Sequence, residues 1–264
     1  DNMSRQLMVA GNWKMNKNLI EAFTLASLVI TQAKKLPSTV EIVLAPPAPY
    51  LHTINSMSKD VPYVKIAAQN CHYETHGAYT GEISAQMLHS MELAYVIIGH
   101  SERRKYFNED HPMLAKKVSA ALQAEIQVIF CCGEPLEIRN AATHQAFVQQ
   151  QLEQSLFHLS ETEIQKVVIA YEPVWAIGTG QNASPEQAQE MHAFIRNKLL
   201  QKYNATIADN CTILYGGSCN PSNAATLFAQ ADQHLRWGII YALFQDNVEA
   251  VSYTHLTLPT NREV

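Results

Sequence analysis

The sequence predicts an α/β protein whose single domain is a closed barrel of eight parallel strands alternating with helices, written (β/α)8. Short apolar runs alternate with helical patterns at least seven times along the chain. The chain has 264 residues, 47% of them hydrophobic, and such a barrel typically needs roughly 250. Closure into a barrel is the simplest way for a parallel sheet to lose its edge strands.

Seven strands are predicted from apolar runs without alternation, as expected of parallel strands covered on both faces. These runs are residues 7–10, 41–45, 64–68, 95–98, 127–131, 167–171 and 212–215. Helical patterns lie between them, including residues 115–124, 144–159 and 185–203. The last of these begins with Ser184 as N-cap and Pro185 at the first helical position. The helix after the first strand is predicted to bury a face formed by Leu19, Phe23, Leu25, Leu28 and Val29.

Composition narrows the possible partners and compartment. A net charge of −5 argues against nucleic acid or an anionic membrane as partner, because both bind clustered basic surfaces. No apolar run approaches the roughly 18 to 20 residues of a membrane span, and no signal-peptide pattern opens the sequence, so we expect a cytoplasmic protein. The five cysteines lack zinc-ligand spacing, which predicts reduced buried thiols and no metal site.

Polar side chains follow several strands at the point where each strand ends. Asn12 and Lys14 follow the first strand, His100 the fourth and Glu172 the sixth. Because the carboxyl ends of the strands meet at one end of a barrel, we expect these residues to share one mouth. A carboxylate, an imidazole and an amine in one mouth suit proton transfer next to a carbonyl group. The residues after Glu172 are typical of a hinged loop: Pro173, Trp175, Gly178 and Gly180.

Three motifs resemble those of triosephosphate isomerases. They are Gly11-Asn12-Trp13-Lys14-Met15-Asn16, Ile97-Ile98-Gly99-His100-Ser101-Glu102-Arg103-Arg104 and Tyr171-Glu172-Pro173-Val174-Trp175. The resemblance covers about residues 6–228 and implies a TIM barrel. It also implies an isomerase of glycolysis and gluconeogenesis that interconverts dihydroxyacetone phosphate and D-glyceraldehyde 3-phosphate through an enediolate, with no cofactor.

The resemblance also implies catalytic roles. Glu172 is the base, a neutral His100 moves protons between the substrate oxygens, and Lys14, supported by Asn12, faces the enediolate charge. Glu102 matches a second acidic residue of the family's pocket. Its alternative interpretation is a carboxylate in the first turn of a helix that pairs with a basic neighbour.

Substrate binding and assembly follow from the same resemblance. Asn12 and Lys14 also contact substrate, and Gly178, Gly217 and Ser218 match phosphate-binding positions, where backbone N–H groups cluster. Residues 77–82 resemble a long loop that places Thr80 near the lysine of a neighbouring subunit, which implies a homodimer. The alternative for that loop is an ordinary exposed turn.

The carboxyl-terminal part departs from the family. An eighth strand followed by Gly-Gly-Ala-Ser is expected, but the chain reads Arg-Trp-Gly-Ile at residues 236–239. The codons CGG TGG GGC ATC A encode this run, and one base later they encode Gly-Gly-Ala-Ser, which suggests a frameshift. The eighth strand and last helix therefore lack their motif, although residues 238–243 have the apolar, β-branched character of a strand. We assign residues 1–251 to the barrel and 252–264 to a non-native or disordered tail.

Two other functions remain open on sequence grounds. Lys14 could act as a Schiff-base nucleophile of an aldolase. Alternatively, the altered carboxyl end could leave an inactive or noncatalytic barrel that binds sugar phosphates.

Overall fold

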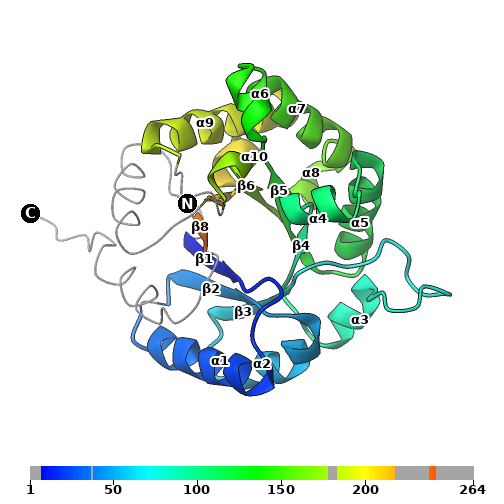
Figure 1. Cartoon of the computed structure of the whole chain (residues 1–264), viewed down its shortest axis with the longest axis vertical. Coiled ribbons are helices and arrows are strands. Elements are labelled where there is room, and N and C mark those ends of the chain that lie inside the picture. The colour runs from blue at the N-terminus through cyan, green and yellow to red at the C-terminus, as the bar shows by residue number, and fades with distance from the viewer. Residues whose placement is uncertain (1–6, 37, 178–182, 218–237, 242–264) are drawn as a thin grey trace, which may run out of the picture.

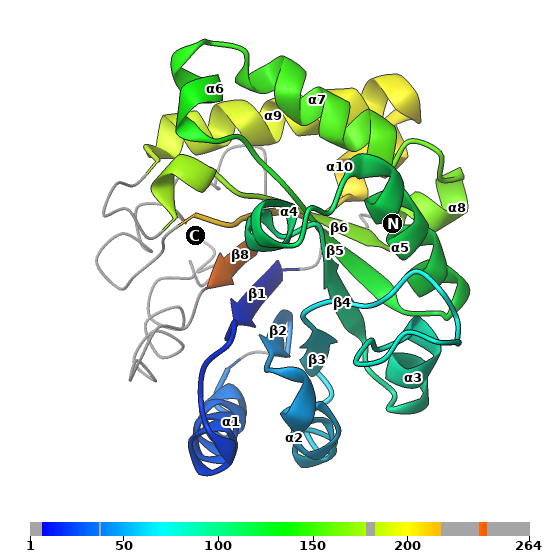
Figure 2. The ribbon, with the colours of Figure 1, turned by 45° about the vertical axis from the view of Figure 1, so that its right-hand side comes forward.

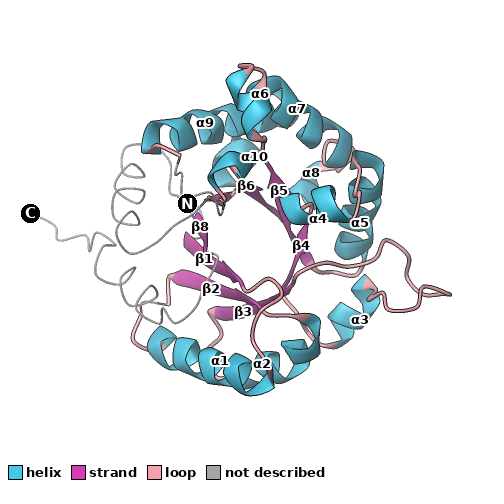
Figure 3. Cartoon of the chain, in the orientation of Figure 1, coloured by secondary structure: helices cyan, strands magenta, loops and turns pink. Residues whose placement is uncertain are grey.

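A computed structural model describes residues 7–36, 38–177, 183–217 and 238–241 (Figure 1). Eight parallel strands form a closed barrel in sequence order, and helices surround it (Figure 3). The strands are β1 Leu7–Asn12, β2 Val40–Ala45, β3 Val64–Ala68, β4 Tyr95–Ile98, β5 Gln127–Cys132, β6 Val167–Tyr171, β7 Ile213–Tyr215 and β8 Gly238–Tyr241. The predicted fold class is confirmed.

The strand β8 closes the barrel although it lacks the expected motif. Gly238 pairs with Leu214 of β7, and Ile239 pairs with Val9 of β1, both in parallel register. The strand character predicted for residues 238–243 is therefore confirmed over residues 238–241. The last helix and the proposed tail lie outside the described residues, so the assignment of the tail stays a prediction.

The helices cover the outside of the barrel. Their bounds are α1 Leu19–Ala33, α2 Leu51–Met57, α3 Ala85–Ser90, α4 Ser101–Tyr106, α5 His111–Gln123, α6 Leu136–Asn140, α7 His144–Ser155, α8 Glu161–Ile164, α9 Pro185–Lys202 and α10 Ala205–Asn210. Short 3-10 turns span Ala48–Tyr50 and Val174–Ala176. None of these described helices is both long and apolar enough to cross a lipid bilayer.

The helix α9 begins as the sequence predicts. Ser184 caps it by accepting a hydrogen bond from the Gln187 backbone, and the Gln187 side chain accepts one from the Ser184 backbone, 2.8 Å away. This reciprocal pair satisfies two N–H groups that would otherwise have no partner at the helix start. Pro185 occupies the first helical position. Met191, Ile195 and Leu199 are fully buried against the barrel.

The predicted apolar face of α1 is wrong in part. Leu19 and Leu28 are 54% and 43% exposed, whereas a stripe of mostly small side chains is buried: Ala22, Ala26, Val29, Ile30 and Ala33. Small side chains let a helix axis come close to the sheet, so here alanine rather than leucine marks the packed face. Hydrophobicity alone therefore placed Leu19 and Leu28 on the packed face in error, whereas Val29 is buried and Phe23 and Leu25 pack against the core as predicted.

The core has two layers. Inside the barrel, short and branched side chains pack against one another, among them Ala10, Val43, Ile97, Ile129 and Leu214. Between strands and helices a larger cluster forms from the outward-facing residues, with Phe130 and Tyr171 fully buried. The interior is therefore filled, and function belongs to the loops at the carboxyl ends of the strands.

Candidate active site at the carboxyl ends of the strands

The carboxylate of Glu172 lies just past the end of β6 and is nearly inaccessible to solvent, with 2% of the residue exposed. Its Oε1 lies 3.1 Å from Nε2 of His100. Its Oε2 accepts a hydrogen bond from the backbone N–H of Ser101, 3.0 Å away. The structure therefore brings together a carboxylate that follows β6 and an imidazole that follows β4, although β5 lies between these two strands in the barrel.

The ring of His100 is held in one tautomer. His100 caps α4, and its Nδ1 accepts a hydrogen bond from the backbone N–H of Glu102 at 3.2 Å. A ring nitrogen that accepts a hydrogen bond carries no proton, so the proton of the neutral imidazole is on Nε2 and points at Glu172. The predicted helix start at Ser101 is confirmed, and it supplies the donor that fixes this tautomer.

The amine of Lys14 reaches the same mouth from β1. Its backbone has φ 53°, a left-handed conformation that is uncommon for a residue with a Cβ. Two polar side chains hold this backbone: Asn12 Oδ1 accepts from Lys14 N at 2.9 Å, and Gln69 Nε2 donates to the Lys14 carbonyl at 2.8 Å. Strain that its neighbours maintain is typical of functional positions.

The carboxylate of Glu102 pairs with Lys14. Its Oε1 lies 2.6 Å from Lys14 Nζ, and its Oε2 lies 3.7 Å from His100 Nδ1. The alternative interpretation, a carboxylate in the first turn of a helix that pairs with a basic neighbour, is correct about the pairing. The basic residue, however, follows another strand and lies in the mouth. Glu102 thus touches two of the predicted catalytic residues.

The side of the mouth that is predicted to bind phosphate is only partly described, because Gly178 and Ser218 lie outside the described residues. Gly217 is buried, and a Cβ there would clash with the hydroxyl group of Tyr215. A Cβ at Gly216 would lie 3.0 Å from Cγ of Glu172. Gly216 therefore allows the chain after β7 to pass close to Glu172, and Gly217 leaves room for the Tyr215 side chain.

Two residues near the mouth were missed from the sequence, Gln69 and Glu134. Gln69 directly follows β3 and donates to the carbonyl groups of both Lys14 and Ala45. Glu134 is fully buried after β5, and its Oε1 accepts from the hydroxyl group of Tyr171 at 2.9 Å and from Trp175 Nε1 at 3.1 Å. Both follow strand ends, so the rule that singled out Glu172 would also have found them.

The thiol of Cys131 interacts with the Glu172 carboxylate. Burial, reinforced by the Glu172 carboxylate, raises the pKa of Cys131 well above its usual value. The thiol therefore stays protonated and neutral. All four described cysteines, Cys71, Cys131, Cys132 and Cys211, are free and buried, as predicted.

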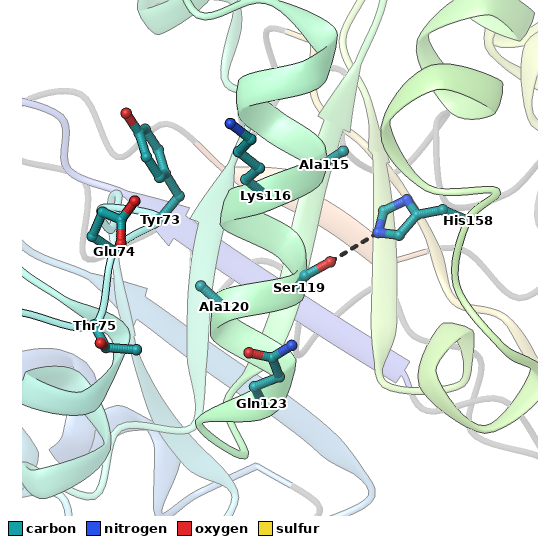
Figure 4. A pocket seen from close by; sticks show the side chains of 9 residues that line it. All are labelled: Tyr73, Glu74, Thr75, Ala115, Lys116, Ser119, Ala120, Gln123 and His158. Carbon is teal, nitrogen blue, oxygen red and sulfur yellow. Dashed lines mark hydrogen bonds between the residues drawn. The ribbon is translucent and has the colours of Figure 1, made fainter.

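A separate pocket lies outside the barrel, between residues 73–75 and α5, where Ser119 Oγ contacts His158 Nε2 at 2.9 Å (Figure 4). None of the predicted site residues lines it. It therefore does not belong to the mouth. Within the described residues, no group of three or more side chains is arranged to hold a metal ion.

The fold and this site define a TIM barrel with a buried carboxylate–imidazole pair at its mouth. The family model described as triosephosphate isomerase matches residues 7–234. A triosephosphate isomerase of Cytophaga hutchinsonii is 52% identical over 229 residues, which cover 86% of this chain and 90% of the relative. Those of Amoebophilus asiaticus and Porphyromonas gingivalis are 47% identical over 227 and 228 residues, covering 85% and 86% of this chain and 89% and 90% of the relatives. The chain belongs to the triosephosphate isomerase family.

Proposed function

We propose that this protein is a triose-phosphate isomerase that interconverts dihydroxyacetone phosphate and D-glyceraldehyde 3-phosphate in glycolysis and gluconeogenesis. Family membership supports the reaction. The observation that carries the mechanism is the buried Glu172 carboxylate facing the protonated nitrogen of a neutral imidazole at 3.1 Å. One group can take a proton from carbon while the other donates a hydrogen bond to oxygen.

Each charged or polar group has a role in the proposed reaction. Glu172 removes the carbon-bound proton next to the carbonyl and returns it to the neighbouring carbon. The Nε2–H of His100 donates to the oxygen on which negative charge develops, and the Lys14 ammonium stabilises that charge. Asn12 binds substrate and fixes the Lys14 backbone. Glu102 holds the Lys14 amine in place through their 2.6 Å ion pair.

Substrate binding must rearrange the base. Both oxygens of Glu172 are engaged with protein donors, one from His100 and one from Ser101. The single Nε2–H of His100 cannot serve Glu172 and a substrate oxygen together. The substrate therefore replaces the direct contact between Glu172 and His100, and the freed carboxylate turns to the reacting carbon.

The phosphate group is assigned to backbone N–H groups at Gly217, Ser218 and Gly178. The position of Gly217 supports this assignment, because it lies two residues past the end of β7 and directly follows Gly216, where a Cβ would lie 3.0 Å from Cγ of Glu172. A glycine there exposes its backbone to a ligand with little steric obstruction.

A turnover assay with a matched variant tests the function. Purified protein should isomerise D-glyceraldehyde 3-phosphate, and Glu172→Gln, which keeps the shape and removes the basicity, should lower kcat by about a hundredfold to ten-thousandfold. Binding of a phosphate-bearing substrate analogue should be largely kept. Turnover by the parent protein no faster than by Glu172→Gln would instead support the noncatalytic barrel.

The aldolase alternative has its own test. Borohydride added with dihydroxyacetone phosphate would trap a Schiff base on Lys14. We expect no covalent adduct by mass spectrometry, because the Glu102 carboxylate holds the Lys14 amine at 2.6 Å and competes with a substrate carbonyl for it.

We also propose a homodimer that forms through the loop around Thr80. This loop projects from the barrel between β3 and α3 (Figure 1), and Tyr79 at its tip is 43% exposed. Met15, next to Lys14, is 95% exposed, which leaves a large apolar side chain beside the mouth for a partner to cover. Light scattering should give twice the mass of one chain, and deleting residues 77–81 should give monomers.

The proposed compartment is the cytoplasm. The four free, buried cysteines of the described chain agree with a reducing environment. Fractionation of the source cells with an antibody to the protein tests this assignment.

A further inference from the structure

Glu134 holds the chain on both sides of the base. Its Oε1 accepts hydrogen bonds from Tyr171, which precedes Glu172, and from Trp175, which follows it. Its backbone carbonyl accepts a third bond from Val174 N at 3.1 Å. Burial, followed by the adjacent Glu134 carboxylate, raises the pKa of Tyr171 far above its usual range, so its hydroxyl group remains a donor. The position of the Glu172 backbone therefore depends on where Glu134 lies.

Glu134 is itself paired with Arg139 of α6. Nη1 of Arg139 lies 3.6 Å from Glu134 Oε1, and the guanidinium carbon lies 5.9 Å from the centre of the Trp175 ring, within range of a cation–π contact. Glu134 is completely buried, and a buried carboxylate without a compensating cation is strongly unfavourable. This pair thus differs from an exposed ion pair, which contributes little.

The other arm of Arg139 is anchored on α9. Nη2 of Arg139 lies 3.3 Å from Oε2 of Glu190, and Glu190 Oε1 accepts from Nε2 of both His144 and Gln145, each at 3.2 Å. Partial burial opposes ionisation, but these donors and Arg139 together hold the pKa of Glu190 below its usual value. Three helices on one side of the barrel, α6, α7 and α9, thus meet at this anchor (Figure 2).

We propose that Arg139, anchored by Glu190, is a positioning residue for Glu172 and acts through Glu134; this inference rests on the proposed role of Glu172 as base. Arg139 contacts neither the base nor the mouth residues His100 and Lys14. It fixes the Glu134 carboxylate, and that carboxylate fixes Tyr171 and Trp175 on either side of Glu172. Proton transfer is sensitive to displacements of about 1 Å. Loosening the contacts of Glu134 with Tyr171 and Trp175 should therefore lower the rate of the chemical step more than the substrate affinity.

The test compares Arg139→Gln with the parent protein by steady-state kinetics and fluorine NMR. Arg139→Gln should lower kcat by about tenfold to a hundredfold and leave KM within a few-fold. In protein labelled with 5-fluorotryptophan, the Trp175 signal, assigned with Trp175→Phe, should shift or broaden. Glu190→Gln should change both readouts in the same direction by a smaller amount.

Additional variants separate positioning from general stability. Arg139→Lys keeps a charge and should retain more kcat than Arg139→Gln. The double variant Arg139→Gln/Glu190→Gln should be no slower than Arg139→Gln alone, because the anchor acts through the arginine. The matched control is Glu92→Gln, which breaks the exposed 3.2 Å pair of Glu92 with Lys59 and should leave kcat unchanged.

The other possible outcomes of these experiments each support or overturn the proposed role of Arg139. An unchanged kcat in Arg139→Gln of an active enzyme overturns it, and additive losses in the double variant overturn the role of Glu190. If the parent protein has no turnover, the proposed function fails. The fluorine NMR readout then tests the inference separately, because an unchanged Trp175 signal in Arg139→Gln would show that Arg139 does not fix Trp175 through Glu134. If Arg139→Gln does not fold, Glu190→Gln carries the test through the same two readouts.

Discussion

The strained backbone of Lys14 depends in part on Gln69, which does not touch substrate in the proposed reaction. Gln69 Nε2 donates to the carbonyl groups of Lys14 and Ala45, each at 2.8 Å. Gln69→Leu removes both bonds and takes the side-chain donor from the Lys14 carbonyl, whereas the Ala45 carbonyl still accepts from Trp13 N at 3.1 Å. The loss should cost about 1 to 3 kcal/mol of folding stability. The amine should also lose its fixed position, so kcat should fall, as an isomerase assay can measure.

A control variant separates the effect of Gln69→Leu on folding stability from its effect on kcat. Asn55→Leu removes one comparable bond, from Asn55 Nδ2 to the Met91 carbonyl at 2.8 Å, far along the chain from the mouth. It should lower the melting temperature and leave kcat unchanged. If Gln69→Leu also left kcat unchanged, Gln69 would serve stability only.

At the scale of single residues, the sequence predicted the side chains that meet in the candidate site better than the residues that support them. Glu172, His100 and Lys14 could be found because each follows a strand end and has a reactive side chain. Gln69 and Glu134 follow strand ends too, but an amide and a second carboxylate suggest no chemistry by themselves. The tautomer of His100 and the positive φ of Lys14 depend on contacts between strands far apart in sequence, which no local pattern contains.

The packing of α9 on β6 introduces a pH-dependent term in stability. His192 is buried, at 2% exposed, and its ring meets the ring of Tyr171 edge-on with centroids 6.1 Å apart. Burial, assisted by the charge of Arg196, lowers the pKa of His192 to about 3. The folded protein therefore keeps this ring neutral, whereas the unfolded chain takes up a proton below about pH 6.5.

The sign of the effect follows from that difference. Below about pH 6.5 the unfolded state binds one more proton, so this term reduces the free energy of unfolding by up to about 1.4 kcal/mol per pH unit as the pH falls toward 3. Urea unfolding between pH 7 and pH 4 should therefore show a shallower slope for His192→Gln than for the parent protein. Equal slopes would mean that His192 gains its proton in the folded state as well.

The sequence predicted the strands and the long helix α9 better than the short helices, for physical reasons. All seven strand predictions are confirmed to within three residues, because buried parallel strands are continuous apolar runs bounded by turn residues. The long helix α9 was predicted from its N-cap residue and from the helical spacing of its apolar residues. The helices α2, α3, α4, α6, α8 and α10 contain four to seven residues, too few to establish a helical period, and only the start of α4 was predicted.

At the scale of the whole molecule, the carboxyl end departs from the family's sequence, and this departure concerns two features: the closure of the barrel and the phosphate site expected from the family. The family model ends its match at residue 234, a few residues beyond the limit of about 228 set from motifs. Yet β8 pairs with both β7 and β1, so the ring of strands does not require the family's own sequence at this point. The phosphate site does depend on sequence, because two of its expected N–H donors come from the missing Gly-Gly pair.

A repaired chain separates these two consequences. Replacing everything after Ala229 with an eighth strand, Gly-Gly-Ala-Ser and an amphipathic helix should restore two backbone donors to a phosphate dianion, worth about 3 to 6 kcal/mol in total. That corresponds to an increase in kcat/KM of about a hundredfold or more, while the pH dependence of kcat set by Glu172 and His100 stays unchanged. The melting temperature should also rise, because a covering helix adds buried apolar surface outside the barrel. If the given chain were already as stable and as fast as the repaired one, β8 and the residues around it would have to supply phosphate contacts of their own, and the frameshift interpretation would be wrong.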